Sequence, residues 1–133
     1  MKPVVLGIHH IAIKAKGLEK FNELLAFYHE ILGMPIIRSW GTETNPIVMV
    51  DTGAGRLELF ANAPDELSEG ALRHIAFAVE NVDDCIEAVR AKGYKVTIEP
   101  KDMILGTADH PYPVRLAFCI GPVGEDVEFF TEL

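Results

Sequence analysis

Two histidines and two glutamates occupy matching places in the two halves of this 133-residue chain. His10 opens the string HIAI, which returns as HIAF beginning at His74. Glu58 lies within the string LELF, and Glu128 lies within the similar string VEFF. A carboxylate in the middle of an apolar strand is costly to bury unless it is paired or bound to a cation. The repeated pattern therefore directs attention to metal chemistry.

Two imidazoles and two carboxylates suit one divalent ion such as Ni²⁺, Zn²⁺, Co²⁺ or Mn²⁺. If the halves are related by a pseudo-twofold axis, each supplies one His and one Glu, and two positions of an octahedral ion stay open for water or substrate. Each residue alone has a plainer interpretation, because a His on a strand is often a satisfied core or rim residue and a Glu often points to solvent. The repetition of both at corresponding positions favours the metal.

The same order of elements positions the four residues in each half. Apolar spacings of three and four after Leu18 predict a helix that Gly33 ends, and Asn81 is typical of the cap of a second helix that Gly93 ends. Alternation and turn residues predict the flanking strands at residues 6–15, 36–41, 46–51, 55–61, 73–80, 94–98, 114–120 and 126–131.

The fold class that follows is α+β, with two tandem βαβββ modules at about 6–61 and 72–133. A copy of about 60 residues buries little surface by itself, so we expect one domain over 1–133 with a shared, curved mixed sheet around a metal-containing cleft.

The second half has about ten more residues than the first between the helix-ending glycine and the strand glutamate. We expect these residues to form an irregular loop at 102–113, because Gly106, His110, Pro111 and Pro113 disfavour a regular element there.

Composition excludes several other classes of protein. The chain is 49% hydrophobic and 24% charged, which indicates a globular core, and its net charge of −8 disfavours nucleic acid and anionic membranes as partners. No apolar run approaches the length of about 20 residues that a membrane helix needs. Cys85 and Cys119 lie in apolar patterns and do not indicate a disulfide framework. We expect a cytoplasmic protein.

Taken together, the modules and the four residues resemble the vicinal-oxygen-chelate superfamily, which includes glyoxalase I, methylmalonyl-CoA epimerase and extradiol dioxygenases. The resemblance runs from Ile8 to Phe130 and is supported by the strings AFY at 26–28, LGM at 32–34 and AKGY at 91–94. It implies a U-shaped cleft and a metal held by two His and two Glu. Glyoxalase I has this ligand order and is the most similar member.

The resemblance also implies a mechanism. A substrate with neighbouring carbonyl and hydroxyl oxygens chelates the ion, which acidifies the C–H between them by stabilising the enediolate. Glu128 then moves the proton between the two carbons, with Glu58 as its symmetric counterpart. Alternation predicts that Phe60 and Phe130 lie on the same face as the two carboxylates, where their rings shield these carboxylates from water.

Two further residues bear on the substrate. Lys14 stands where glyoxalase I carries an Arg that holds a glutathione carboxylate, and Asn62 matches a glutathione-binding Asn. A solvated lysine and a turn asparagine are the plainer interpretations of the two. The expected partner is a small molecule, such as glutathione or another thiol adduct, and we expect a homodimer. An epimerase acting on a coenzyme A thioester and a non-catalytic resistance protein that binds a small molecule stay open as alternatives.

Overall fold

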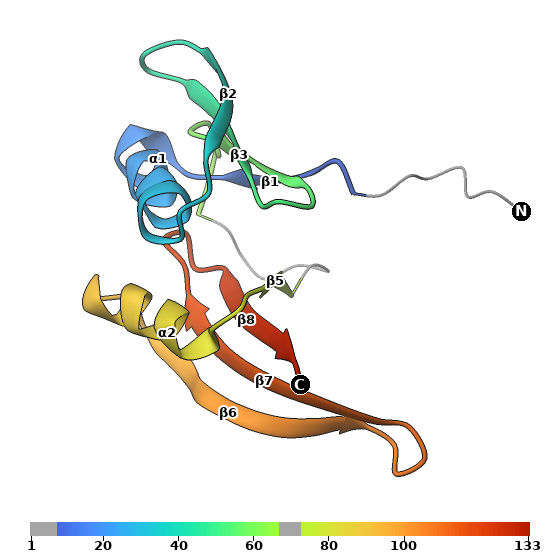
Figure 1. Ribbon diagram of the computed structural model, residues 1–133. Helices are drawn as coiled ribbons and strands as arrows, with labels where there is room; N and C mark the ends of the chain where they lie inside the picture. Colours follow the sequence, from blue (N-terminus) through green and yellow to red (C-terminus); the bar gives the residue numbers. More distant parts are fainter. Residues whose placement is uncertain (1–7, 67–72) are drawn as a thin grey trace, which may run out of the picture. The chain divides into compact units, whose positions relative to one another are not determined.

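The computed structural model describes residues 8–66 and 73–133, and the chain divides into two compact units, Met1–Leu67 and Ser68–Leu133 (Figure 1). Each unit has the element order βαβββ and its own four-stranded mixed sheet. The predicted α+β class with two tandem modules is therefore confirmed. The hydrogen-bonded strands form one sheet in each unit.

The first unit builds its sheet in the order β1-β4-β3-β2, with β1 parallel to β4 and the other pairs antiparallel. Its elements are β1 (His10–Lys14), α1 (Gly17–Leu25), β2 (Ile36–Gly41), β3 (Pro46–Asp51) and β4 (Arg56–Phe60). The predicted strands 36–41 and 46–51 are confirmed to the residue. The predicted strand 6–15 is shorter, and its residues 6 and 7 lie outside the described residues.

The first helix differs from a uniform α-helix in its last turns. A π-helical segment, Ala26–Ile31, continues α1, and the N–H of Leu32 donates to the carbonyl of Phe27, five residues earlier, at 3.0 Å. Phe27 and Tyr28, two consecutive residues, are both fully buried in this segment. Gly33 then has a φ of 74°, the left-handed conformation expected of a helix-ending glycine.

The second unit repeats this arrangement in the order β5-β8-β7-β6. Its elements are β5 (His74–Ala78), α2 (Val82–Ala91), β6 (Val96–Gly106), β7 (Pro111–Ile120) and β8 (Asp126–Glu132). The predicted helix cap is confirmed, because Oδ1 of Asn81 accepts a hydrogen bond of 3.0 Å from the N–H of Asp84. Among the described residues, neither unit has a helix of the length and hydropathy needed to span a bilayer.

The predicted irregular loop at 102–113 is wrong, because this segment is the end of a long hairpin (Figure 1). Strands β6 and β7 have eleven and ten residues, whereas the corresponding β2 and β3 have six each. The extra residues of the second half therefore lengthen both strands. Thr107 and His110 exchange both backbone hydrogen bonds. Along an antiparallel ladder, hydrogen-bonded pairs alternate with pairs that exchange no hydrogen bonds. Gly106–Pro111 and Ile104–Pro113 are of the second kind, so neither pair needs an N–H from its proline.

The hairpin tip is itself part of the repeat. The first unit has GTETNP at 41–46 and the second has GTADHP at 106–111. In both tips the glycine has a positive φ, and the threonine hydroxyl oxygen accepts a hydrogen bond from the backbone N–H three residues later. The shared pattern G-T-x-x-x-P aligns the two hairpins: in each, the glycine ends one strand and the proline begins the next.

Candidate metal centre

His10 and Glu58 lie together on the open face of the first sheet, the face that carries His10, Ala12, Glu58 and Phe60. Strands β1 and β4 are parallel, and Ala12 is the register partner of Glu58. His10 stands two residues before Ala12, so its side chain emerges on the same face as the carboxylate. Nε2 of His10 is 3.5 Å from Oε1 of Glu58. The pair is thus built by the register of two neighbouring strands.

His74 and Glu128 form the same pair in the second unit. Strands β5 and β8 are parallel, Ala76 is the register partner of Glu128, and His74 stands two residues earlier. Nε2 of His74 is 3.3 Å from Oε1 of Glu128. Both units therefore place a His–Glu pair at the same register position of the same strand pair. In each case the register partner of the glutamate is an alanine, a small side chain.

Alternating side chains hold the glutamates on the open faces. Leu57 and Leu59 flank Glu58 and are buried, as are Val127 and Phe129 around Glu128. These apolar residues anchor each strand to the core, so the glutamate between them must point the other way. Phe60 and Phe130 lie two residues after the glutamates and are partly exposed, as alternation predicted for the open face.

The two glutamates differ in their exposure to water. Glu128 is 6% exposed and is the buried charged residue among those the structure describes. Phe118 is its register partner on β7, and the Phe118 ring packs edge-on against the His74 ring with centroids 5.3 Å apart. This burial raises the pKa of Glu128 above its ordinary value, while the charge of His74 acts in the opposite direction and offsets part of the rise.

The donor set fits a divalent ion. Two ligands at right angles around one ion, each at about 2.1 Å, lie about 3 Å apart. The His–Glu separations of 3.5 and 3.3 Å are close to that distance. Within residues 8–66 and 73–133, no three His, Cys, Asp or Glu side chains form a group that could hold a metal ion, and each unit has one His–Glu pair. The convergence of both pairs on one ion stays a prediction.

Lys14 and Asn62 lie at the same end of the β1–β4 pair. Lys14 is the register partner of Phe60, and its Nζ is 5.2 Å from the centre of the Phe60 ring. Asn62 forms an isolated bridge with Lys16, just beyond that end. Both side chains are exposed. The structure therefore puts a cation and an amide at the end of the β1–β4 pair where Phe60 lies, and their role toward a substrate stays a prediction.

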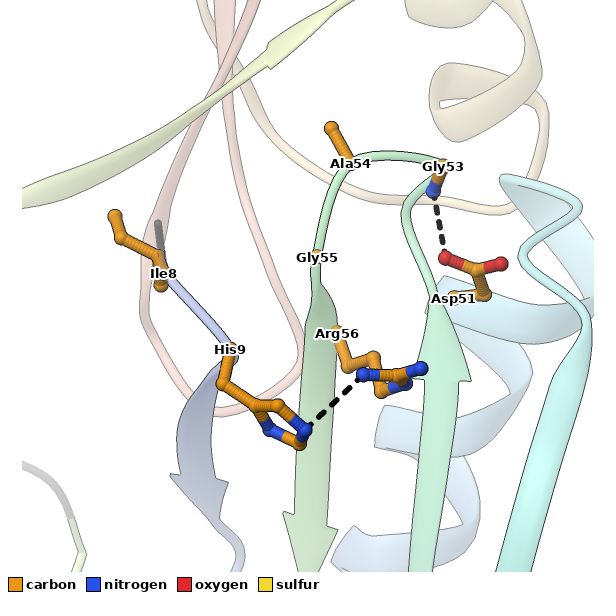
Figure 2. Close-up of a pocket in the computed structure, with 7 residues that line it drawn as sticks. All are labelled: Ile8, His9, Asp51, Gly53, Ala54, Gly55 and Arg56. Carbon is orange, nitrogen blue, oxygen red and sulfur yellow. Dashed lines mark hydrogen bonds between the residues drawn. The ribbon is translucent and has the colours of Figure 1, made fainter. Parts of the chain in front are cut away.

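The sequence repeat assigns no role to His9, the residue next to the predicted ligand His10. Nδ1 of His9 is 3.0 Å from Nδ1 of His10. Its Nε2 is 3.2 Å from Nη1 of Arg56, a contact that Figure 2 shows. The repeat gives His9 no counterpart, because Arg73 stands at the matching position. His9 and Arg56 also line a cavity of about 470 Å³ beside the turn from Asp51 to Arg56. The histidine doublet is visible in the sequence, but the repeat singles out His10 alone.

Paired βαβββ modules, each with a His–Glu pair on its open face, are the features of the glyoxalase-like class that the sequence resembles. The sequence profile of one family, described as the Glyoxalase/Bleomycin resistance protein/Dioxygenase superfamily, matches residues 7–118. The chain belongs to this superfamily.

Individual relatives are consistent with that membership. The chain is 31% identical over 127 residues to a Synechocystis protein named "Probable lactoylglutathione lyase", and the match covers 90% of each chain. Among solved structures, a glyoxalase I mutant from Zea mays is 21% identical with a TM-score of 0.70, over 93% of this chain and 44% of that one. An antibiotic-binding protein from Streptomyces, TnmS3, is 16% identical with a TM-score of 0.73, over 99% of this chain and 100% of that one. The two structural likenesses show the fold alone.

Proposed function

We propose that this protein is a metal-dependent lyase or isomerase of the glyoxalase I type, acting on an α-hydroxycarbonyl substrate such as a hemithioacetal. The observation that carries the proposal is the His–Glu pair repeated in the same register of both units. The relative named as a lactoylglutathione lyase supports the reaction class. Two chance surface pairs would have no reason to share a register.

One divalent ion, such as Ni²⁺, Zn²⁺, Co²⁺ or Mn²⁺, would be held by His10, Glu58, His74 and Glu128. The donor types and the spacing within each pair support this assignment. When bound, the ion supplies positive charge that stabilises negative charge developing on substrate oxygens.

Glu128 is the proposed general base. It would take the proton from the carbon next to the carbonyl and return it to the neighbouring carbon. Its burial supports this role, because a carboxylate with little hydration is a stronger base than a solvated one. Phe118 and Phe130 lie beside it on the open face and exclude water. Glu58 is the counterpart in the first unit and serves as its symmetric ligand.

Lys14 and Asn62 are the proposed contacts for the thiol part of the substrate. The Lys14 ammonium carries the charge that a glutathione carboxylate needs, and it lies over Phe60, two residues beyond Glu58 on β4. Asn62 adds an amide donor and acceptor at the same end of the strand pair.

The test of the function begins with metal-free protein loaded separately with Ni²⁺, Co²⁺ or Zn²⁺. Each form is assayed on the hemithioacetal of methylglyoxal and glutathione, with bound metal measured by mass spectrometry. We expect one ion per site and thioester formation that a chelator abolishes. Absence of turnover with all three metals contradicts the proposal. In that case, turnover of methylmalonyl-CoA identifies the epimerase alternative, and metal-independent ligand binding identifies the resistance-protein alternative.

We further propose that the protein is cytoplasmic and pairs as a homodimer. The free thiols of Cys85 and Cys119 are consistent with a reducing compartment. Sedimentation equilibrium of the metal-loaded protein measures the mass, and a monomer at all concentrations contradicts the pairing.

A further inference from the structure

His9 is the side chain next to the proposed centre that the ligand set does not use. Its ring contacts His10 through one nitrogen and Arg56 through the other, and Figure 2 shows the contact with Arg56. Arg56 is the first residue of β4 and follows His9 by 47 residues in the sequence. In the second unit His74 instead packs against the Phe118 ring. The two pairs are therefore alike in register but differ in what supports the histidine.

Hydrogen-bond chemistry assigns the protons of this chain of contacts. A guanidinium only donates, so Nε2 of His9 must accept from Nη1 of Arg56 at 3.2 Å. The proton of a neutral His9 ring is then on Nδ1, which donates to Nδ1 of His10 at 3.0 Å. The proton of a neutral His10 ring is consequently on Nε2, the nitrogen that faces Glu58.

A cation at Nε2 of His10 requires the opposite assignment. The ligating nitrogen must offer its lone pair, so the His10 proton moves to Nδ1 and needs an acceptor. Nδ1 of His9 lies at hydrogen-bond distance and can accept it. The His9 proton then sits on Nε2 and faces the Arg56 guanidinium, donor against donor. Arg56 must move away for the chain to reverse.

We propose that His9 is a positioning residue for the metal ligand His10, and that Arg56 weakens cation binding by holding His9 in the tautomer that donates to His10. This inference rests on the proposed function, since it takes His10 as a ligand. It goes beyond that function by assigning roles to two residues outside the ligand set, in the first unit.

The test measures the affinity of Co²⁺ and Zn²⁺ for the purified full chain by competition with a coloured chelator. In the Arg56→Ala background, where His9 is free to accept from His10, we expect His9→Ala to weaken binding by about 10- to 100-fold, the usual effect of removing an outer-shell partner. His9→Asn should restore part of the affinity, because its side-chain oxygen accepts a hydrogen bond. Arg56→Ala should strengthen binding. His110→Ala is the matched control, because His110 is exposed at the β6–β7 tip and should leave the affinity unchanged.

The outcomes separate this inference from the proposed function. If the wild-type protein binds no metal, both are overturned. If it binds metal and the His9→Ala, Arg56→Ala double variant matches Arg56→Ala, only the role of His9 is overturned. If Arg56→Ala binds more weakly than wild type, the opposing role of Arg56 is overturned.

A readout without metal tests the proton assignment directly. In metal-free protein, ¹⁵N NMR of the imidazole nitrogens should find the His10 proton on Nε2 and the His9 proton on Nδ1. A His10 proton on Nδ1 would overturn the chain of donors. Thermal unfolding of each metal-free variant confirms that its fold is retained.

Discussion

Nε2 of His74 lies 3.3 Å from Oε1 of Glu128, although the two residues belong to the first and last strands of their unit. The parallel pairing of β5 with β8 places Ala76 opposite the glutamate and so brings the histidine two residues earlier onto the same face. Backbone register alone sets this pair. Because β1 and β4 use the same register, a His–Glu pair is a structural property of each module.

Replacing Glu128 with Gln should abolish most of the proton transfer. The amide keeps the size of the side chain but cannot act as a base, so we expect a loss in kcat of at least about 100-fold. Glu58→Gln is the matched variant, and its loss in kcat should be smaller at equal metal content. Steady-state kinetics on the hemithioacetal, with metal quantified in each sample, makes the comparison. Equal kcat values for the two variants would contradict the assignment of Glu128 as the base.

Metal removal should lower the stability of the native state. A ligand that binds only the folded protein stabilises it by about 2.7 kcal/mol at 100 times its Kd. We therefore expect chelator to lower the Tm of the loaded protein, and the fall to disappear in His74→Ala. Calorimetry with and without chelator measures both. A Tm of wild type that does not respond to added metal would contradict the site.

The hairpin tips should not tolerate side chains on their glycines. A Cβ on Gly106 would lie 2.3 Å from the carbonyl oxygen of His110, and one on Gly41 would lie 2.4 Å from that of Asn45. We expect Gly106→Ala and Gly41→Ala to lower the free energy of unfolding by about 1–3 kcal/mol. Gly53→Ala is the control, because Gly53 also has a positive φ but no heavy atom within 4 Å of its Cβ. Urea unfolding should rank it as the mildest change.

The stability of the second unit should fall in acid through Asp83. Arg115 donates to both carboxylate oxygens of Asp83, at 2.7 and 2.8 Å, and holds the pKa of Asp83 below its ordinary 3.8. A lowered native pKa stabilises the fold above the ordinary value, and this contribution is lost as the pH falls through the lowered pKa. Asp83→Asn should therefore be less stable than wild type at pH 7, and the difference should shrink at pH 2.

Urea midpoints at the two pH values test this linkage. Asp109→Asn, at the exposed hairpin tip, is the control and should follow wild type at both. A difference between Asp83→Asn and wild type that is the same at pH 7 and pH 2 would rule out the carboxylate as its source.

The two thiols should react slowly in the native protein. Cys119 is fully buried, and burial raises its pKa to about 12; the pKa of Cys85 is also raised by burial. Since the thiolate is the reactive form, iodoacetamide should label Cys119 only after unfolding, and Cys85 sooner because it is less buried. Mass spectrometry of timed samples, with and without urea, follows each site. Rapid native labelling of Cys119 would contradict the packing of β7.

Alternation and repetition in the sequence were sufficient to predict much of the fold. Both amphipathic helices have short-range spacings, and strands 36–41 and 46–51 are bounded by turn residues, so local pattern and structure agree. The prediction failed at 102–113, because a proline is compatible with a strand wherever its missing N–H faces away from the ladder. That depends on which residues pair, and only the closed hairpin decides it.

For the candidate site, the sequence by itself determined which four side chains share a type and a strand position, because strand periodicity and an internal repeat are local properties. The tertiary structure decided the rest. The burial of Glu128 depends on its packing among residues of other strands, and the contact between His9 and Arg56 joins residues 47 positions apart. Contacts of this kind arise only when the chain folds back on itself and pairs β1 with β4, since no short-range pattern encodes which distant side chain meets a given ring.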